Sequence, residues 1–116
     1  MSSDEACIFC RIAAGEFGTT FLYESDNVVA FDDLAPQANT HVLVVPRRHI
    51  SGIAEVGPTD AELLAELVTA ANGIARQRGL DESGYRLLTN NGPDAGQTVM
   101  HLHLHLLGGN ELAALG

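Results

Sequence analysis

The stretch His101-Leu102-His103-Leu104-His105-Leu106-Leu107 constrains the fold more than any other part of the chain. Side chains of a β-strand point alternately to opposite faces, so regular alternation of apolar and polar residues predicts a strand that is buried on one face. The leucines would pack onto a core, and the three histidines would share the other face. We therefore predict a final strand over residues 100–107, with an apolar layer on one side and a row of imidazoles on the other.

A long amphipathic helix is predicted to cover that apolar face. Between Thr59 and Arg78, apolar side chains recur on one stripe with a period of 3.6 residues. Thr59 and Glu62 match a capping box, in which each side chain bonds a free backbone N–H of the first turn. Gly79 can adopt the left-handed conformation that commonly ends a helix. These features predict a helix over residues 59–78.

Shorter apolar runs predict the remaining elements. Residues 6–14 suit a short helix, and four strands are expected at residues 21–23, 28–31, 41–45 and 85–89. The polar turn Ser25-Asp26-Asn27 joins the first two strands into a hairpin. Because strands cluster before and after one long helix, an α+β fold with an antiparallel sheet is favoured over a parallel βαβ fold. No repeat or linker interrupts the chain, so residues 1–116 are expected to form a single domain.

Charge and hydropathy exclude two classes of partner. The net charge of −9 argues against binding to nucleic acid, because neutralising a phosphate backbone requires a basic stripe. No apolar run reaches the roughly 18 residues of a transmembrane helix, so no membrane interaction is expected. The acidic N-terminus does not resemble a signal peptide, and we therefore expect a cytoplasmic protein.

Three imidazoles in a row are unusual on a strand face and indicate chemistry. A solvated strand face usually carries Lys, Glu or Thr, and histidine is not a preferred strand residue. Neighbouring imidazoles can act near pH 7 as nucleophile, proton donor and phosphate ligand. The polar loop 90–98 leads directly into this strand, and its backbone N–H groups, with Gln97 and Thr98, could hold an oxyanion. We therefore expect an active site on the histidine face.

Cys7 and Cys10 form a Cys-x-x-Cys pair with more than one interpretation. A redox function would need a thioredoxin-like βαβ context, which the pattern does not show. A metal site needs two further ligands, and His49 and His101 would complete a Cys2His2 set. The two cysteines could equally be small apolar side chains of a helix. The spacing alone favours neither the metal site nor simple packing.

Taken together, these motifs resemble the histidine triad family, whose hallmark is His-φ-His-φ-His-φ-φ with φ apolar. Residues 101–107 match the hallmark completely, and residues 7–12, 31–41 and 44–50 are similar to further family segments in the expected order. The ending at residues 107–109 resembles the nucleotide-binding branch, which purine nucleoside phosphoramidases typify. The resemblance implies a histidine-triad-like fold with a five-stranded antiparallel sheet, one long helix and a short N-terminal helix. It also implies a homodimer in which two such sheets join into ten strands, with the long helices at the interface.

The resemblance also implies a role for each site residue. His103 corresponds to the nucleophile, which forms a nucleotidyl-histidine intermediate, and His41 corresponds to a histidine that helps to orient the nucleophile. His105 and Thr98 correspond to positions that bind phosphate and handle protons. The remaining nucleotide-binding positions comprise the ribose carboxylate, two polar loop residues and the apolar purine cleft: Asp33, Asn90, Gln97, Ile8, Phe9, Phe31, Leu34 and Leu43.

Zinc and a reaction follow from the same resemblance. Zinc-carrying members use the positions of Cys7, Cys10, His49 and His101, which implies one structural zinc ion per chain and no organic cofactor. The implied activity is hydrolysis of adenosine or guanosine 5′-phosphoramidates and acyl-adenylates, which releases a purine nucleoside monophosphate. One alternative is a dinucleoside polyphosphate hydrolase, whose branch shares the string at residues 96–99. The other is a zinc-stabilised nucleotide-binding or interaction module with little turnover, against which the intact His103 argues.

Overall fold

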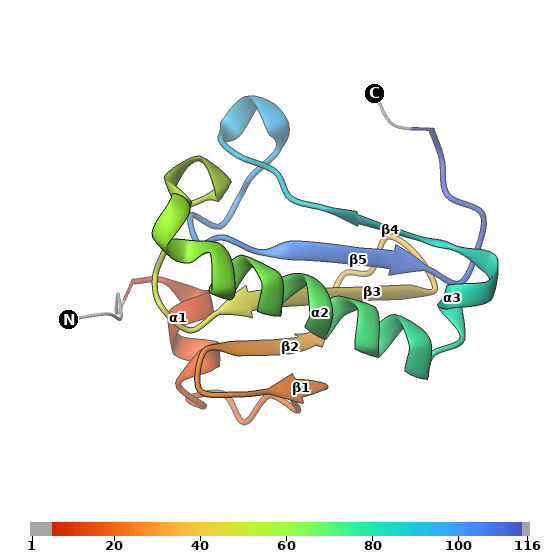
Figure 1. The fold of residues 1–116 in the computed structure, drawn as a ribbon, viewed down its shortest axis with the longest axis horizontal. Helices are drawn as coiled ribbons and strands as arrows, with labels where there is room; N and C mark the ends of the chain where they lie inside the picture. Colours follow the sequence, from red (N-terminus) through yellow and green to blue (C-terminus); the bar gives the residue numbers. More distant parts are fainter. Residues whose placement is uncertain (1–5, 115–116) are drawn as a thin grey trace.

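The computed structural model describes residues 6–114, which form one antiparallel sheet with helices packed on its two faces (Figure 1). The five strands lie in the order β1-β2-β3-β5-β4, and the long helix α2 runs across one face. This arrangement confirms the predicted α+β fold. The elements are α1 (Ile8–Ala13), β1 (Tyr23–Glu24), β2 (Val28–Asp32), β3 (Thr40–Pro46), α2 (Ala61–Gln77), α3 (Leu80–Ser83), β4 (Tyr85–Leu88) and β5 (Leu104–Gly108), with the 3-10 turns η1 (Ile53–Glu55), η2 (Pro58–Asp60) and η3 (Pro93–Ala95).

The last strand, β5, begins at Leu104, so the predicted start at residue 100 is wrong. The ladder between β3 and β5 ends with the pair Val44 and Leu104. In the same register the next two pairs would be Val45 with His103 and Pro46 with Leu102, and Pro46 has no N–H to donate. The N–H of Leu102 donates instead to the Ile50 carbonyl at 2.6 Å. Residues 100–103 are therefore held outside the regular ladder.

The alternation of the histidine stretch nevertheless extends beyond the regular strand. Leu102 is buried in the core beneath α2, together with the leucines of β5. His101 and His103 lie on the opposite face, where the ring of Phe9 meets both imidazoles edge-on. The predicted separation of leucines and histidines onto two faces is thus confirmed.

Each face of the sheet has its own apolar cluster. The cluster beneath α2 draws on β2, β3, β5 and the buried stripe of the helix: Val28, Ala30, Val42, Val44, Ile50, Leu67, Ala70, Ala71, Ile74, Ala75, Leu80, Leu102, Leu104 and Leu106. The opposite cluster joins α1 to the sheet: Cys7, Phe9, Cys10, Ala13, Val29, Phe31, Leu43 and Val45. The second cluster surrounds the histidine row, so α1 is packed beside the imidazoles.

The N-terminus of α2 differs from the prediction. The helix begins at Ala61, and the predicted capping box of Thr59 and Glu62 is not formed. The Asp60 side chain stabilises the 3-10 turn before the helix, because its carboxylate accepts a hydrogen bond from the Gly57 N–H at 3.0 Å and pairs with Arg48, but it makes no cap hydrogen bond to α2 itself. The backbone hydrogen bond and Arg48 lower the pKa of Asp60 below its usual range. Pro58 initiates a 3-10 turn ahead of the helix, and the N-cap position falls on Asp60 rather than on Thr59.

The other predicted elements are present, with some shifted ends. The first strand of the hairpin is residues 23–24 rather than 21–23, because Phe21 packs against the α1-side cluster. Gly79 follows α2 with φ of +74°, as predicted, but it leads into the short helix α3, which the sequence pattern did not indicate. The remaining ends differ from prediction by one or two residues.

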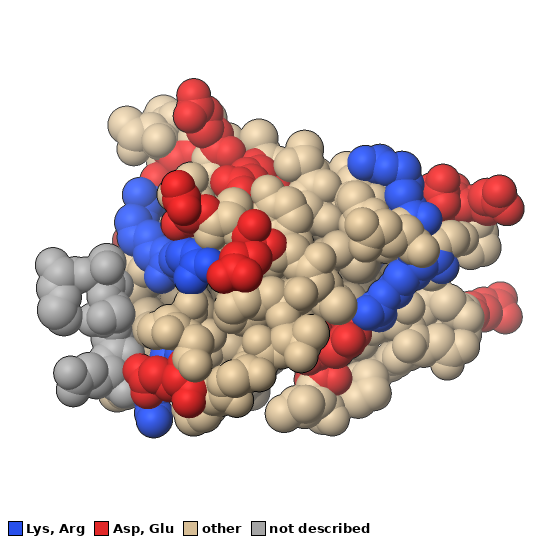
Figure 2. All heavy atoms as spheres, turned by 90° about the horizontal axis from the view of Figure 1, so that it is seen from below, with Lys and Arg blue, Asp and Glu red and all other residues tan. Residues whose placement is uncertain are grey.

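The surface carries mixed charge. The six cationic side chains of the sequence are all arginines: Arg11, Arg47, Arg48, Arg76, Arg78 and Arg86. Figure 2 shows one face, on which arginines and acidic side chains gather in small mixed groups separated by uncharged areas. Within residues 6–114, no helix has both the length and the apolar character needed to cross a bilayer.

Candidate active site and metal centre

His103, the candidate nucleophile, is held in a single tautomer. Its Nδ1 lies 2.7 Å from the carbonyl oxygen of His101. A carbonyl can only accept, so Nδ1 must carry the proton and Nε2 keeps its lone pair. Burial lowers the pKa of His103, although the bond to His101 and the charge of Asp33 raise it in part. The imidazole is therefore neutral near pH 7, with the attacking nitrogen set by a backbone contact.

A chain of hydrogen bonds sets the proton of His105. The Gln37 N–H donates to Nδ1 of His41 at 3.0 Å, so the proton of neutral His41 is on Nε2. That Nε2 lies 2.9 Å from Nδ1 of His105 and donates to it. The proton of His105 is consequently on its Nε2. Burial, followed by the neighbouring His103 and His41, lowers the pKa of His105 to about 4.

His41 is hydrogen-bonded to His105. The resemblance implies that His41 helps to orient the nucleophile, and this stays a prediction. The bond in which His103 itself takes part runs from its Nδ1 to the His101 carbonyl. His41 also faces Asp33, whose Oδ2 is 3.4 Å from Nε2 of His41. His41 therefore connects a carboxylate to the second histidine of the site.

A cavity of about 360 Å³ opens over His103 and His105. All five apolar residues predicted for the purine cleft line it, and so do Asp33 and Thr98. Leu34 is 100% exposed and lines the cavity, so it lies at the mouth. Four further residues line the cavity without having been predicted from the sequence: Ile12, Thr19, Asp32 and Val99. The i, i+4 spacing of Ile8 and Ile12 on one helix could have identified Ile12.

One of the two carboxylate oxygens of Asp33 is hydrogen-bonded to the backbone of its own loop. Its Oδ1 accepts a hydrogen bond from the Ala35 N–H at 2.8 Å, which fixes the turn after β2. Its Oδ2 faces His41 and the cavity. The carboxylate is therefore placed to interact with a ligand while it also shapes the loop.

Hydrogen bonds of the Gln97 side chain hold the loop before the histidines in place. Gln97 is buried, its Oε1 accepts from the Gly92 N–H at 2.7 Å, and its Nε2 donates to the carbonyls of Ser51 and Val99 at 2.7 and 3.0 Å. Neither Asn90 nor Gln97 lines the cavity over the histidines. The loop presents Thr98 to the cavity, and Gln97 holds the loop in place.

The electrostatic character of the cavity is unusual for a site expected to hold phosphate. Its lining includes Asp32 and Asp33 but no lysine or arginine. The polar groups near the nucleophile are the neutral His105 and the hydroxyl of Thr98. Such a cavity suits a ligand of low negative charge.

The four predicted metal ligands converge. The ligand atoms of Cys7, Cys10, His49 and His101 all lie within 4.8 Å of one another. Nδ1 of His101 is 3.3 Å from Sγ of Cys7 and 3.5 Å from Sγ of Cys10, whose Sγ is also 3.3 Å from Nδ1 of His49. A tetrahedral site with metal–ligand lengths of about 2.0–2.3 Å has ligand–ligand edges of about 3.3–3.8 Å. The donor set therefore fits a tetrahedral metal ion.

The surroundings of His101 also fit a metal ligand. Its Nε2 lies 2.8 Å from the Pro46 carbonyl, so Nε2 carries the proton and Nδ1 is left free for a metal. This is the usual arrangement of a metal-bound histidine, whose second nitrogen donates to a carbonyl or carboxylate. Both cysteines are buried, and neither forms a disulfide.

A second group, Asp33, His41 and His105, also has ligand atoms within 4.8 Å, but it does not fit a metal ion. The 2.9 Å separation of the two imidazole nitrogens is shorter than a tetrahedral N–N edge of about 3.3 Å. The Gln37 N–H also keeps the proton of His41 on the nitrogen that would have to bind the metal. In this group His41 and His105 are instead hydrogen-bonded to each other, and Asp33 lies 3.4 Å from His41.

Comparisons with known proteins agree with this site. The HIT domain family model matches residues 14–112. The chain is 40% identical to the purine nucleoside phosphoramidase of Escherichia coli, over 96% of this chain and 93% of that protein. It is 40% identical to a 14 kDa zinc-binding protein of Zea mays, over 94% of this chain and 86% of that protein. A HIT family hydrolase from Clostridium thermocellum has the same fold, with a TM-score of 0.93, 43% identity and coverage of 97% and 98% of the two chains. The chain belongs to the HIT family.

Because the pKa of His105 is lowered in the folded chain, the stability of the fold should depend on pH. Its pKa in the folded chain, about 4, is below the unfolded value of about 6.5, so the folded state binds fewer protons between these values. The contribution of neutral His105 to stability is therefore complete above pH 6.5 and is lost as the pH falls towards 4. We expect His105→Gln to reduce the drop in melting temperature between pH 7 and pH 5. An NMR titration midpoint of His105 at pH 6 or above would contradict this assignment.

Proposed function

We propose that the chain is a purine nucleoside 5′-phosphoramidate and acyl-adenylate hydrolase that acts through a nucleotidyl-His103 intermediate. The observation that carries this proposal is a neutral His103 whose Nε2 lone pair is free beside a cavity with a carboxylate at one end. The apolar walls suit a purine, and Asp33 is placed to accept hydrogen bonds from ribose hydroxyls. The similarity to the Escherichia coli phosphoramidase supports the same class of substrate.

The reaction needs two displacements at phosphorus. Nε2 of His103 attacks the phosphorus, the P–N bond of the substrate breaks, and the amine leaves with a proton supplied by solvent. Water then attacks the phosphorus, the bond to Nε2 breaks, and the nucleoside monophosphate leaves. His105 Nε2–H and the Thr98 hydroxyl are the donors available to the phosphoryl oxygens in both steps. The His101 carbonyl keeps Nδ1–H in place and stabilises the positive charge on the phosphorylated ring.

The charge of the cavity lining favours phosphoramidates over dinucleoside polyphosphates as substrates. Those substrates carry several negative charges, whereas no lysine or arginine lines the cavity and two aspartates do. A phosphoramidate or an acyl-adenylate carries a single phosphoryl group, which two neutral donors can serve. We therefore rank the phosphoramidate class above the polyphosphate class for this chain. The intact nucleophile and the hydrogen bond between His41 and His105 argue against a binding module with little turnover.

We further propose one zinc ion per chain, bound by Cys7, Cys10, His49 and His101. The support is the tetrahedral fit of the four donors and the similarity to the zinc-binding protein of Zea mays. With four protein ligands the zinc is structural and supplies stability rather than a reactive water. It also bears on catalysis, since His101 would be held at Nδ1 by zinc while its carbonyl orients His103. Reduced thiols of this kind fit a cytoplasmic protein.

A homodimer joined along β4 completes the proposal. Within residues 6–114, β4 is a terminal strand of the sheet and pairs only with β5. Its outer edge has N–H and C=O groups that can pair with a second copy, which would extend the sheet to ten strands. Tyr85 at the start of β4 is one of the exposed large apolar residues. No organic cofactor is needed by the reaction.

The experiment that tests the proposed function compares substrates and traps the intermediate. We expect hydrolysis of an adenosine 5′-phosphoramidate with a kcat/KM at least about tenfold above that for diadenosine tetraphosphate, which the cavity lining disfavours. Rapid acid quenching followed by peptide mass spectrometry should find one nucleoside monophosphate on the peptide that contains His103.

His103→Ala is the control for this experiment. It should lose the adduct and at least about a thousandfold of the turnover, and should still bind adenosine monophosphate, because the nucleoside contacts lie elsewhere in the cavity. Turnover by His103→Ala near the wild-type rate would assign the attack to water. A preference for the dinucleotide would select the polyphosphate alternative.

Asp33 should determine the preference for ribose. Because a charge-assisted hydrogen bond is worth about 1.5–3 kcal/mol, Asp33→Asn should weaken binding of adenosine monophosphate roughly 10–100-fold and affect the 2′-deoxynucleotide much less. Asparagine is chosen for the test because its side-chain oxygen can still accept from the Ala35 N–H, which keeps the loop in place. Calorimetric titration of both nucleotides measures the effect, and equal losses would limit Asp33 to a structural function.

Removal of a zinc ligand should unfold the metal centre. Protein expressed with adequate zinc should contain one zinc ion per chain, and Cys10→Ser should contain much less and melt at a lower temperature, because metal binding contributes directly to folding. Elemental analysis and thermal melts test this together. Unchanged zinc content and melting temperature in Cys10→Ser would refute the assignment.

A further inference from the structure

Residues 50–54, here termed the support segment, lie outside the cavity over the histidines but against the loop that carries Thr98. The carbonyl of Ser51 accepts a hydrogen bond from Nε2 of Gln97 at 2.7 Å, and the same Nε2 donates to the Val99 carbonyl at 3.0 Å. One side chain therefore holds the backbone on both sides of Thr98, and that side chain is anchored to the support segment.

Gly52 is the point of the support segment at which the loop leaves no room for a side chain. The residue is buried, and its φ of −176° is extended backbone that any residue can adopt. A Cβ at this position would lie 2.5 Å from Oδ1 of Asn91 and 3.4 Å from Oε1 of Gln97. The close approach of Asn91, and not the backbone conformation, is therefore what requires a glycine here.

Asn91 uses the space beside Gly52 to bond the support segment. Its Oδ1 accepts a hydrogen bond from the Ala54 N–H at 2.9 Å. The next residue, Gly92, donates its N–H to Oε1 of Gln97 at 2.7 Å, and its carbonyl accepts from the Gln97 N–H at 3.1 Å. Two side chains of the loop thus contact the support segment, and Gly92 links one to the other.

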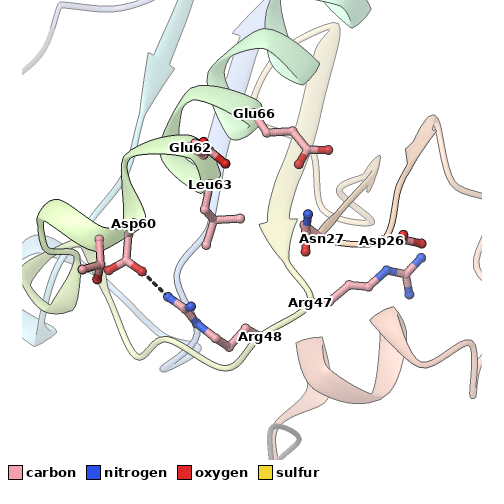
Figure 3. A pocket seen from close by; sticks show the side chains of 9 residues that line it. Asp26, Asn27, Arg47, Arg48, Asp60, Glu62, Leu63 and Glu66 are labelled. Atoms are coloured by element: carbon pink, nitrogen blue, oxygen red, sulfur yellow. Dashed lines mark hydrogen bonds and ion pairs between the residues drawn. The ribbon is translucent and has the colours of Figure 1, made fainter.

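The support segment is itself fixed on both sides. The Ile50 carbonyl accepts a hydrogen bond from the Leu102 N–H at 2.6 Å, within the histidine stretch. Arg48 and Asp60 form an ion pair, which Figure 3 shows joining the two ends of the connection between β3 and α2, beside a cavity of about 770 Å³. A displacement at Gly52 is therefore transmitted to the loop, because the support segment is held in place.

We propose that Gly52 and Asn91 are positioning residues that set the place of the Thr98 hydroxyl relative to His103. This inference rests on the proposed function, in which that hydroxyl donates to the phosphoryl oxygens. A donor is effective when it lies about 2.7–3.1 Å from the oxygen that gains charge, so a small shift of the loop reduces the rate. A methyl group at position 52 would displace the Asn91 side chain and shift the loop in this way.

The effect should be confined to the phosphoryl group of the ligand. The apolar walls of the cavity and Asp33 come from α1, β2, β3 and the segments that adjoin them, whereas the loop contributes Thr98. A shifted loop therefore changes contacts to phosphate and leaves those to the nucleoside in place. Binding of adenosine, which has no phosphoryl group, separates this role from a general defect of the fold.

The test is a double-variant cycle between Gly52→Ala and Asn91→Ala. Gly52→Ala should lower kcat for an adenosine 5′-phosphoramidate at least about tenfold. It should weaken binding of adenosine monophosphate roughly tenfold and leave binding of adenosine unchanged. Asn91→Ala, which removes one hydrogen bond without adding bulk, should cost about threefold in kcat and in binding of adenosine monophosphate. The double variant should match Asn91→Ala, because the methyl group then has room.

Gly57→Ala is the matched control. Gly57 lies in the same connection between β3 and α2, and its φ of −128° also belongs to extended backbone. Among residues 6–114, its chain neighbours aside, no heavy atom lies within 4 Å of the position of a Cβ at Gly57. This variant should retain the wild-type kcat and the wild-type affinity for adenosine monophosphate. Thermal melts of all variants report whether the fold is kept.

Several outcomes would overturn the inference. Wild-type kcat and nucleotide binding in Gly52→Ala or in Asn91→Ala would show that the contact does not reach Thr98. Equal losses of affinity for adenosine and adenosine monophosphate would limit both residues to the fold. Additive losses in the double variant would place the collision elsewhere. If the wild-type protein does not hydrolyse the phosphoramidate, the proposed function fails, and the comparison of the two ligands still decides the positioning role.

Discussion

The hydrogen bond between Nδ1 of His103 and the carbonyl of His101 is the contact on which the site depends. The bond places the proton of the buried imidazole on Nδ1 and leaves the lone pair on Nε2. The acceptor is a backbone carbonyl, so no second side chain is needed to fix the tautomer. The same residue that supplies the carbonyl also lies among the two cysteines and His49, and bonds to Pro46 through its other ring nitrogen. The orientation of His103 is therefore tied to the cluster of Cys7, Cys10 and His49 and to the end of β3.

Burial gives the site its electrostatic character. His103 and His105 are kept neutral because they lie in the apolar layer between α1 and the sheet, where a charged ring is poorly solvated. Within residues 6–114, no buried side-chain nitrogen or oxygen lacks a hydrogen-bond partner, so the polar row is accommodated without a cost in unpaired groups. A network of neutral donors of this kind can hold a phosphoryl group without a positive side chain, and this restricts the charge of the ligands that fit.

Much of the fold follows from local pattern. The alternation at residues 101–107 predicts an apolar strand face, and the apolar stripe of α2 predicts a helix that covers such a face. Both predictions are confirmed, because the two sets of side chains pack into one cluster. The errors have identifiable physical causes. Pro46, 55 residues from His101 in sequence, ends the ladder that the alternation alone would extend to residue 100. Pro58 begins a 3-10 turn, α2 starts only at Ala61, and the Asp60 carboxylate bonds back to the Gly57 N–H rather than to the helix; a capping motif in the sequence does not reveal this.

The sequence by itself singled out the candidate residues: three histidines on one strand face, a Cys-x-x-Cys pair, and a polar loop before the histidines. Only the tertiary structure decided how they are connected. It brings Cys7 and Cys10 to His101, more than ninety positions away, and it pairs His41 with His105 rather than with the nucleophile. It also turns Gln97 inward as a brace and leaves Thr98 at the wall of the cavity. Residue type and spacing specify chemical capacity, whereas tautomers, pKa shifts and the shape of a binding site depend on contacts between segments distant in sequence.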